Sequence, residues 1–463
     1  MFFPDTYIKR RSSLKRTLKS GLILILGNSE TPMNYPANTY HFRQDSNFLY
    51  FFGLDFPDIA GIIDIDENKD IIFGNDFDIN DIIWMGAQPS LNEKAQLSGV
   101  KITQPFNKLF EYINEAIKKE RKIHFLPPYR AENKILLESL VGIKPEVIRN
   151  YASLELILAI VDLRSVKDKE EIEELEKAAN IGYEMQVKAM NMAKPGVIEQ
   201  TIAGTIEGIA ISNGGYPTFP IILSQNGQIL HNHSHNQALT KGRLMVCDCG
   251  AESARHYASD HTRTVPVGGK FTTKQREIYQ IVLAANNKAI ETAKPGIKYR
   301  DVHLLVCKTI IEGLLKTGIM KGNADEALEA GAHALFMPHG LGHMIGLDVH
   351  DMEDLGQKYV GYDKDTQPAT QFGLSALRMG RMLKTGFAVT DEPGIYFIPD
   401  LIDKWKSENK HEQFINYTKL ENYRDFGGIR LEDMILITET GCRIIGKRPP
   451  ITVEDIEAIT AIE

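Results

Sequence analysis

The stretch AMNMAKPGV at residues 189–197 recurs as AIETAKPGI at residues 289–297. In each copy a helical segment ends at Lys-Pro-Gly, because proline and glycine terminate helices. A second helical segment carrying Ile-Glu-Gly follows each copy, at residues 206–208 and 311–313. Acidic residues beside strand-like segments then follow in matching order. An internal repeat of this kind predicts a pseudo-twofold domain with a curved antiparallel sheet inside and helices outside.

The part of the chain before the repeat has a different pattern. At 463 residues the chain is too long for one ordinary core. The charged helical stretch that opens the repeat begins near Arg164, so we place a domain boundary near Val161, which gives domains 1–160 and 161–463. Upstream, GLILILG and AGIIDIDENKDIIFG predict strands, while residues 105–121 and 133–140 have helical spacing. The predicted fold class is α+β, with a smaller α/β N-terminal domain that is structural or oligomer-forming.

Composition excludes several classes of protein. The net charge of −8 argues against a nucleic-acid partner, which would require a basic patch. The longest apolar run is too short to cross a bilayer, and the N-terminus lacks the apolar region of a secretory signal. Four cysteines are too few for a disulfide scaffold. We therefore expect a cytoplasmic protein with no membrane partner. Cys247 and Cys249 are interpreted as small buried hydrophobes, with a thiolate metal site as the alternative.

Four carboxylates and one imidazole stand beside apolar or strand-like segments of the second half. They are Asp248 in VCDCG, Asp260 in SDHTRTVPV, His343 in HGLGH, Glu392 in TDEPG and Glu432 in IRLED. A buried carboxylate costs several kcal/mol unless it is paired or bound to metal. Taken alone, Asp248, Asp260 and Glu392 are better explained as turn or capping residues. The complete ordered set instead predicts a centre of two divalent cations that share bridging carboxylates.

These motifs together resemble the metal site of the pita-bread metallopeptidases of family M24. The similarity is greatest to Xaa-Pro aminopeptidases (aminopeptidase P) and next to prolidases. It extends over nearly the whole chain, including the N-terminal stretch NYPANTYHFRQDSNFLYFFGLDFPD. Two features depart from the family pattern. The spacing from Asp248 to Asp260 is one residue longer, which predicts a bulge near the site, and residues 400–426 look like an insertion.

The resemblance implies a role for each ligand. Asp248 would chelate one cation, Asp260 and Glu432 would bridge the two, and His343 with Glu392 would complete the second position. Carboxylate oxygens with one imidazole suit Mn²⁺, with Co²⁺, Fe²⁺ or Zn²⁺ as alternatives. Glu392 would also carry a proton to the departing prolyl nitrogen.

Three further histidines and one arginine complete the predicted site. By resemblance, His350 would stabilise the oxyanion, His339 would contact the substrate beyond the scissile bond, and His231 would lie on the substrate side. His231 opens the tract ILHNHSH, in which His233 and His235 alternate with it, so a strand would place all three on one face. A surface metal-binding patch is the alternative for this tract. Arg430 shares the strand face of Glu432 and is placed to anchor carboxylates.

The resemblance implies an aminopeptidase that releases the first residue from peptides beginning Xaa-Pro. Two alternatives stay open. A prolidase would cleave Xaa-Pro dipeptides with the same ligands, and a catalytically inactive pita-bread domain would bind proteins. The presence of all five ligands disfavours the inactive domain. We expect a homo-oligomer, either a dimer or a tetramer.

Overall fold

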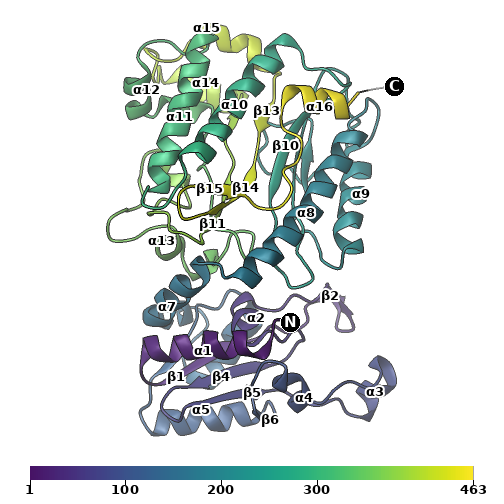
Figure 1. The fold of residues 1–463 in the computed structure, drawn as a ribbon, viewed down its shortest axis with the longest axis vertical. Coiled ribbons are helices and arrows are strands. Elements are labelled where there is room, and N and C mark those ends of the chain that lie inside the picture. Colours follow the sequence, from purple (N-terminus) through teal and green to yellow (C-terminus); the bar gives the residue numbers. More distant parts are fainter. Residues whose placement is uncertain (462–463) are drawn as a thin grey trace. The chain divides into compact units, whose positions relative to one another are not determined.

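The computed structural model describes residues 1–461 and divides into two compact units (Figure 1). Unit 1 holds Met1–Arg164 with Asp354–Tyr359, and unit 2 holds Ser165–Glu353 with the chain from Val360 on. Val161, near which the sequence predicts a domain boundary, lies within helix α7 (Leu154–Ser165).

Unit 1 is built on a five-stranded mixed sheet with strand order β6-β5-β4-β1-β7. Apolar residues of β1, β4 and β5 pack with those of α5 and α6 into one buried core. The strands and helices predicted from this part of the sequence are confirmed. The elements of unit 1 before α7 are α1 (Pro4–Leu18), β1 (Leu22–Leu26), β2 (Pro32–Tyr35), β3 (Asn38–Thr39), α2 (Ser46–Phe52), β4 (Ala60–Asp64), β5 (Lys69–Phe73), α3 (Ile79–Met85), α4 (Leu91–Gln96), β6 (Ile102–Gln104), α5 (Lys108–Lys118), β7 (Ile123–Phe125), α6 (Ala131–Val141) and η1 (Ile148–Tyr151).

The repeat predicted from Lys-Pro-Gly is present in unit 2 as two helical hairpins. The first pairs α8 (Lys169–Met192) with α9 (Glu199–Ser212), and the second pairs α10 (Thr273–Thr292) with α11 (Tyr299–Lys316). The Lys-Pro-Gly connections of the two hairpins make equivalent backbone hydrogen bonds. Gly196 N donates to Leu239 O at 2.8 Å, and Gly296 N donates to Leu383 O at 3.0 Å. Both glycines have a positive φ, of 86° and 85°, which a residue with a side chain rarely adopts.

The strands of unit 2 form antiparallel sheets between these helices. The strand orders are β10-β9-β8, β11-β14-β15 and β12-β13. Helix α8 contacts β9 and β10, whereas α10 contacts β11, β12, β13 and β15 (Figure 1). The predicted arrangement of outer helices and inner antiparallel strands is therefore confirmed. The strands are β8 (Ile222–Ser224), β9 (Leu244–Cys249), β10 (His261–Pro266), β11 (Ala388–Asp391), β12 (Gly394–Tyr396), β13 (Gly428–Arg430), β14 (Asp433–Ile437) and β15 (Cys442–Ile444).

Two departures from the family pattern are resolved by the structure. The hairpin of β9 and β10 keeps one register from the Leu244–Pro266 pair to the Cys249–His261 pair, and the bridge between Glu252 and Ala258 continues it. The predicted bulge near the site is therefore wrong, and the added residue lies at the tip of the hairpin.

The segment that looks like an insertion is helical. It contains α14 (Pro399–Ser407), α15 (Tyr417–Leu420) and η5 (Glu421–Tyr423). It docks beyond the end of α11, where Ile415 pairs with Met320. The remaining short elements are α12 (Ala324–Ala330), η2 (Ala332–Leu335), η3 (Glu353–Leu355), α13 (Gln357–Val360), η4 (Leu374–Ala376) and α16 (Val453–Ile459). None of the helices described between residues 1 and 461 has both the length and the apolarity that a bilayer crossing requires.

Candidate metal centre

Asp248 and Asp260 lie at the inner end of the β9–β10 hairpin. Asp248 pairs in register with Thr262, and Asp260 immediately precedes β10. Both side chains are buried. Asp260 precedes Thr262 by two residues along the chain, so their side chains point to the same face. Two acidic groups thus face the same interior space from adjacent strands.

The HGLGH segment lies against β11 without forming a regular strand. Thr390 N donates to His343 O at 3.0 Å, and Glu392 N donates to Leu341 O at 2.9 Å. Gly342 is required for this approach, because a Cβ atom there would lie 2.1 Å from Thr390 O. The close contact aligns His343 with Glu392 across the two segments.

Glu392 and Glu432 each occupy a short break between strands. Glu392 lies between β11 and β12, and Glu432 between β13 and β14. His343 Nε2 is 3.4 Å from Asp260 Oδ2 and 3.7 Å from Glu392 Oε1. One donor atom each from Asp260, His343 and Glu432 lies within 4.8 Å of the others. The five predicted ligands, which come from separate parts of unit 2, therefore meet in one place.

The atoms of this cluster are set for a cation. Within residues 1–461, Oδ1 of Asp248 and Oδ1 of Asp260 are buried and have no hydrogen-bond partner. Nδ1 of His343 lies 3.0 Å from Met344 O. Because a carbonyl oxygen only accepts hydrogen bonds, Nδ1 carries the proton. In the neutral ring this leaves the Nε2 lone pair facing carboxylate oxygens, a repulsive contact that a divalent ion would relieve. The residues present fit divalent cations.

The electrostatics support the same conclusion. Burial, and then the neighbouring Asp248 carboxylate, hold the pKa of Asp260 well above its ordinary value. Burial and then Asp260 do the same to the pKa of Glu432, while burial raises the pKa of Glu392 to about 7. Burial lowers the pKa of His343. Carboxylic acids that are crowded and desolvated in this way ionise only when a nearby positive charge compensates their negative charge.

Arg430 supplies part of that charge through a network that the sequence only partly predicted. Its Nη2 donates to Asp248 Oδ2 at 2.7 Å, which leaves Asp248 Oδ1 free. Its Nε donates to Oγ1 of Thr262 at 3.1 Å, and that hydroxyl donates to Glu432 Oε2 at 2.7 Å. Its Nη1 donates to Tyr396 OH at 2.9 Å. Sequence reasoning gave no role to Thr262 or Tyr396.

Two of the predicted histidines line the cluster. His339 Nε2 lies 2.9 Å from Tyr396 OH, and its Nδ1 lies 3.9 Å from Glu392 Oε2. The ring centroid of His350 is 4.1 Å from that of His343, and its Nδ1 is bonded to Glu353. His350 is half-buried, so its other ring nitrogen can reach a bound molecule.

The histidine tract is not a strand, so the prediction that all three rings share one face is wrong. His231 is exposed in an irregular segment; partial burial and then Arg430 lower its pKa, which places it near the cluster. His235 turns away, with its ring nitrogens 2.9 Å from Leu223 O and 3.1 Å from Ile221 O. Leu223 lies in β8, the edge strand of its sheet, and Ile221 immediately precedes that strand, so the ring caps carbonyls at this edge.

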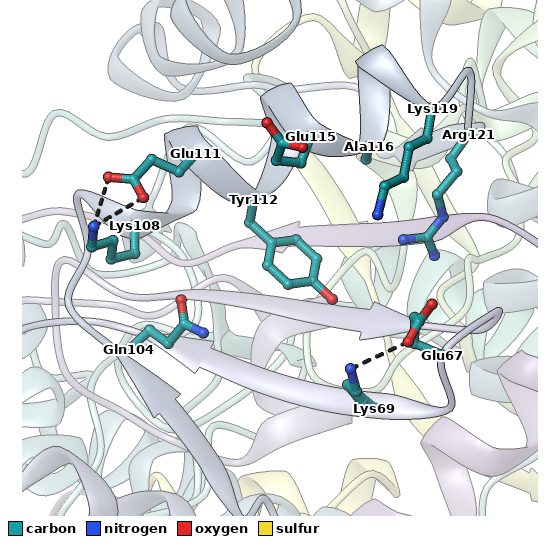
Figure 2. Close-up of a pocket in the computed structure, with 10 residues that line it drawn as sticks. All are labelled: Glu67, Lys69, Gln104, Lys108, Glu111, Tyr112, Glu115, Ala116, Lys119 and Arg121. Carbon is teal, nitrogen blue, oxygen red and sulfur yellow. Dashed lines mark hydrogen bonds and ion pairs between the residues drawn. The ribbon is translucent and has the colours of Figure 1, made fainter.

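Unit 1 has a pocket of 360 Å³ beside α5 (Figure 2). Its charged groups largely pair with one another. Lys108 bonds both carboxylate oxygens of Glu111, and Lys69 lies 3.3 Å from Glu67. The pocket therefore offers no convergent set of free donors like that of unit 2.

Comparisons with known proteins match one family model to each of the two units. The model of metallopeptidase family M24 matches residues 173–439, and that of the aminopeptidase P N-terminal domain matches residues 7–124. A probable Xaa-Pro aminopeptidase of Fusarium vanettenii is 33% identical over 91% of this chain and 88% of its own length. The Xaa-Pro dipeptidase of Homo sapiens is 31% identical over 96% and 90%. Aminopeptidase P from Escherichia coli with the inhibitor Pro-Leu has a TM-score of 0.81 at 28% identity, covering 99% of this chain and 98% of that one.

A buried cluster of carboxylates around one imidazole, held between two repeated helical hairpins, defines a metal-dependent hydrolase of the pita-bread fold. The chain belongs to metallopeptidase family M24, and its residues 7–124 match the model of the aminopeptidase P N-terminal domain. The family implies divalent metal ions.

Proposed function

We propose that this protein is a dinuclear metal-dependent aminopeptidase that releases the first residue from peptides beginning Xaa-Pro. The convergence of Asp260, His343 and Glu432 donor atoms within 4.8 Å carries the proposal. The relatives named Xaa-Pro aminopeptidase and the likeness to aminopeptidase P support the substrate class. Two cations are proposed because two ions that share bridging carboxylates would use all five of these side chains.

The proposed ligands are Asp248, Asp260, His343, Glu392 and Glu432. Mn²⁺ is the proposed metal, because the donors are carboxylate oxygens and a single imidazole. When bound, such ions supply a water of lowered pKa and polarise the scissile carbonyl. The chain itself would hold Asp248 in place through Arg430 and Glu432 through Thr262.

The remaining side chains would handle protons and position the substrate. Glu392, which lies beside His343 and His339 in the cluster, would carry a proton to the prolyl nitrogen. As the bond to the carbonyl carbon breaks, the departing nitrogen must gain a proton, like any amine leaving group. His339 is oriented by Tyr396 and faces Glu392, which suits a contact beyond the scissile bond. His350 would donate to the developing oxyanion from Nε2. Because Nδ1 is already bonded to the Glu353 carboxylate, this donation requires the doubly protonated ring, which that carboxylate favours.

Replacing His350 by alanine is expected to lower kcat about 100-fold or more with little change in KM, since an oxyanion donor acts only in the transition state. The metal content should stay unchanged, because His350 is not among the proposed metal ligands. Glu353→Gln is the matched control. Its amide oxygen can still accept from His350 Nδ1, so activity should fall much less. Steady-state kinetics with elemental analysis test both variants. A rise in KM alone would make His350 a ground-state binding residue.

Arg378 gives specific support to a second candidate function, an Xaa-Pro dipeptidase. A dipeptidase must bind the prolyl carboxylate at its closed end. The Arg378 guanidinium contributes to lowering the pKa of His231, His339, His343 and His350, after burial, so it faces the cluster. Its Nε lies 3.4 Å from Glu353 Oε1. Against this, His231 is exposed and Arg378 only partly buried, so this side of the site is open to a longer chain.

Tripeptides and longer peptides beginning Xaa-Pro are expected to be cleaved at the first bond, with dipeptides slower. Acetylated peptides and peptides with alanine in place of proline should be poor substrates. Steady-state kcat/KM over the series Xaa-Pro, Xaa-Pro-Xaa and Xaa-Ala-Xaa measures this. Arg378→Met separates the two candidates, because it should affect longer peptides little in an aminopeptidase. Dipeptide turnover above that of every longer peptide, lost in Arg378→Met, would assign a dipeptidase.

A further inference from the structure

A second group of metal-ligand side chains lies outside the carboxylate cluster. His303 and Cys307 are four residues apart on α11, so both lie on one face of the helix. His333 belongs to η2 and faces them. One donor atom from each of the three lies within 4.8 Å of the others. The two imidazole rings meet edge to face, with centroids 6.5 Å apart.

This group is buried and only partly satisfied. His303 and Cys307 are 0% exposed and His333 is 1% exposed. The Cys307 thiol lies 3.5 Å from His303 Nε2, which a thiol–imidazole hydrogen bond would explain. His333 is not satisfied: neither of its ring nitrogens has a hydrogen-bond partner within residues 1–461. A buried polar ring without partners is costly, so a missing partner is required.

The chemistry of the donors selects the partner. Burial lowers the pKa of His303 to about 3 and that of His333 to about 4, so both rings are neutral with lone pairs available. Two imidazoles with one thiol are soft donors that suit Zn²⁺ and differ from the oxygen-rich cluster. Zn–N and Zn–S bonds in a tetrahedral site place their N and S atoms ~3.5 Å apart. The observed Cys307–His303 separation of 3.5 Å equals that value.

We propose that His303, Cys307 and His333 bind a structural zinc ion, separate from the carboxylate cluster. Cys307 would release its proton to the solvent on binding, and the three side chains would supply three of the four ligands that Zn²⁺ takes. The ion would tie α11 to the segment that begins at η2 and continues into HGLGH. It would therefore anchor the backbone that presents His339 and His343. Because the site is buried, the metal enters as the chain folds and leaves slowly.

Cobalt substitution tests this site by a signal that the carboxylate cluster cannot give. Protein is produced in medium in which Co²⁺ replaces Zn²⁺ and is then treated with a chelator. A thiolate bound to Co²⁺ gives a near-ultraviolet charge-transfer band, whereas carboxylates and imidazoles do not. The wild-type protein should show this band. Cys307→Ser should lose it together with about one equivalent of cobalt per chain.

Three controls locate the signal. Cys442→Ser replaces a half-buried thiol elsewhere and should keep the band. Glu432→Gln, a change in the carboxylate cluster, should also keep it. His333→Gln should weaken it while leaving every thiol in place, which keeps the test valid if Cys307→Ser folds poorly. No band in the wild-type protein would overturn the proposal. A band that persists in Cys307→Ser, which would point to Cys247 and Cys249, would also overturn it.

Discussion

Glu432→Gln is expected to lower kcat/KM by far more than 100-fold while leaving the fold intact. Changing a residue that merely supports a metal ligand already costs about 10–100-fold, and the ligand itself should cost more. The glutamine amide has the same shape, and its oxygen can still accept from Thr262 Oγ1, which now donates to Glu432 at 2.7 Å. The negative charge is lost. Kinetics, circular dichroism and elemental analysis of the bound metal test this variant.

A matched substitution and metal removal control for this result. Glu176→Gln makes the same change in a partly exposed pair with Arg443 and should leave activity unchanged. Stripping the wild-type protein with a chelator should abolish hydrolysis. Mn²⁺ should restore it better than Mg²⁺, which gives up its waters reluctantly. Full activity after exhaustive chelation, with no metal detected, would contradict the two-metal centre.

The repeat decided how much of the fold could be predicted. The ends of α8 at Met192 and of α10 at Thr292, each three residues before a proline, are local events with a local cause, so they can be located from the sequence. Alternating or continuous apolar runs located β1, β4 and β5 in the same way. The hairpin bulge was wrong because a count of residues between two ligands does not say where the added residue lies.

The histidine tract shows the limit of periodicity. His231, His233 and His235 alternate as a strand would, but the residues between them are polar, so neither face has apolar area to bury. In the structure His235 instead caps the free edge of β8. Nothing in the local sequence indicates that contact, which depends on where another strand ends.

Part of the hydrogen-bond network around the cluster could have been predicted from the sequence. Thr262 stands two residues after Asp260, so strand periodicity places it on the same face. Tyr396 lies in the TDEPGIY motif, and a buried tyrosine hydroxyl requires a partner. Arg378 had no such signal, because its approach to the four histidines depends on the path of an irregular segment before β11. The five candidate ligand residues, by contrast, could be selected from the sequence because each lies in a short motif of its own.

Arg263→Met is expected to destabilise unit 2 by about 3–5 kcal/mol, the usual cost of breaking a buried ion pair. Arg263 is 0% exposed and lies in β10, beside the carboxylate cluster. Its Nη2 donates to Asp433 Oδ1 at 2.7 Å, its Nη1 to Glu432 O at 2.7 Å, and its Nε to Pro450 O at 3.0 Å. Methionine fills part of the volume but meets none of these acceptors.

The loss should therefore be larger than the loss of one salt bridge. Asp433 keeps Arg448 at 2.8 Å, but the carbonyls would be left buried without this donor. Arg443→Met is the matched control, because it removes the same group from the partly exposed pair with Glu176, where the change should stay below about 1 kcal/mol. Denaturant unfolding of both variants measures the difference. Equal stability of the two variants would mean that Arg263 contributes no more than a surface pair, and that the strand ends carrying Glu432 are held by packing alone.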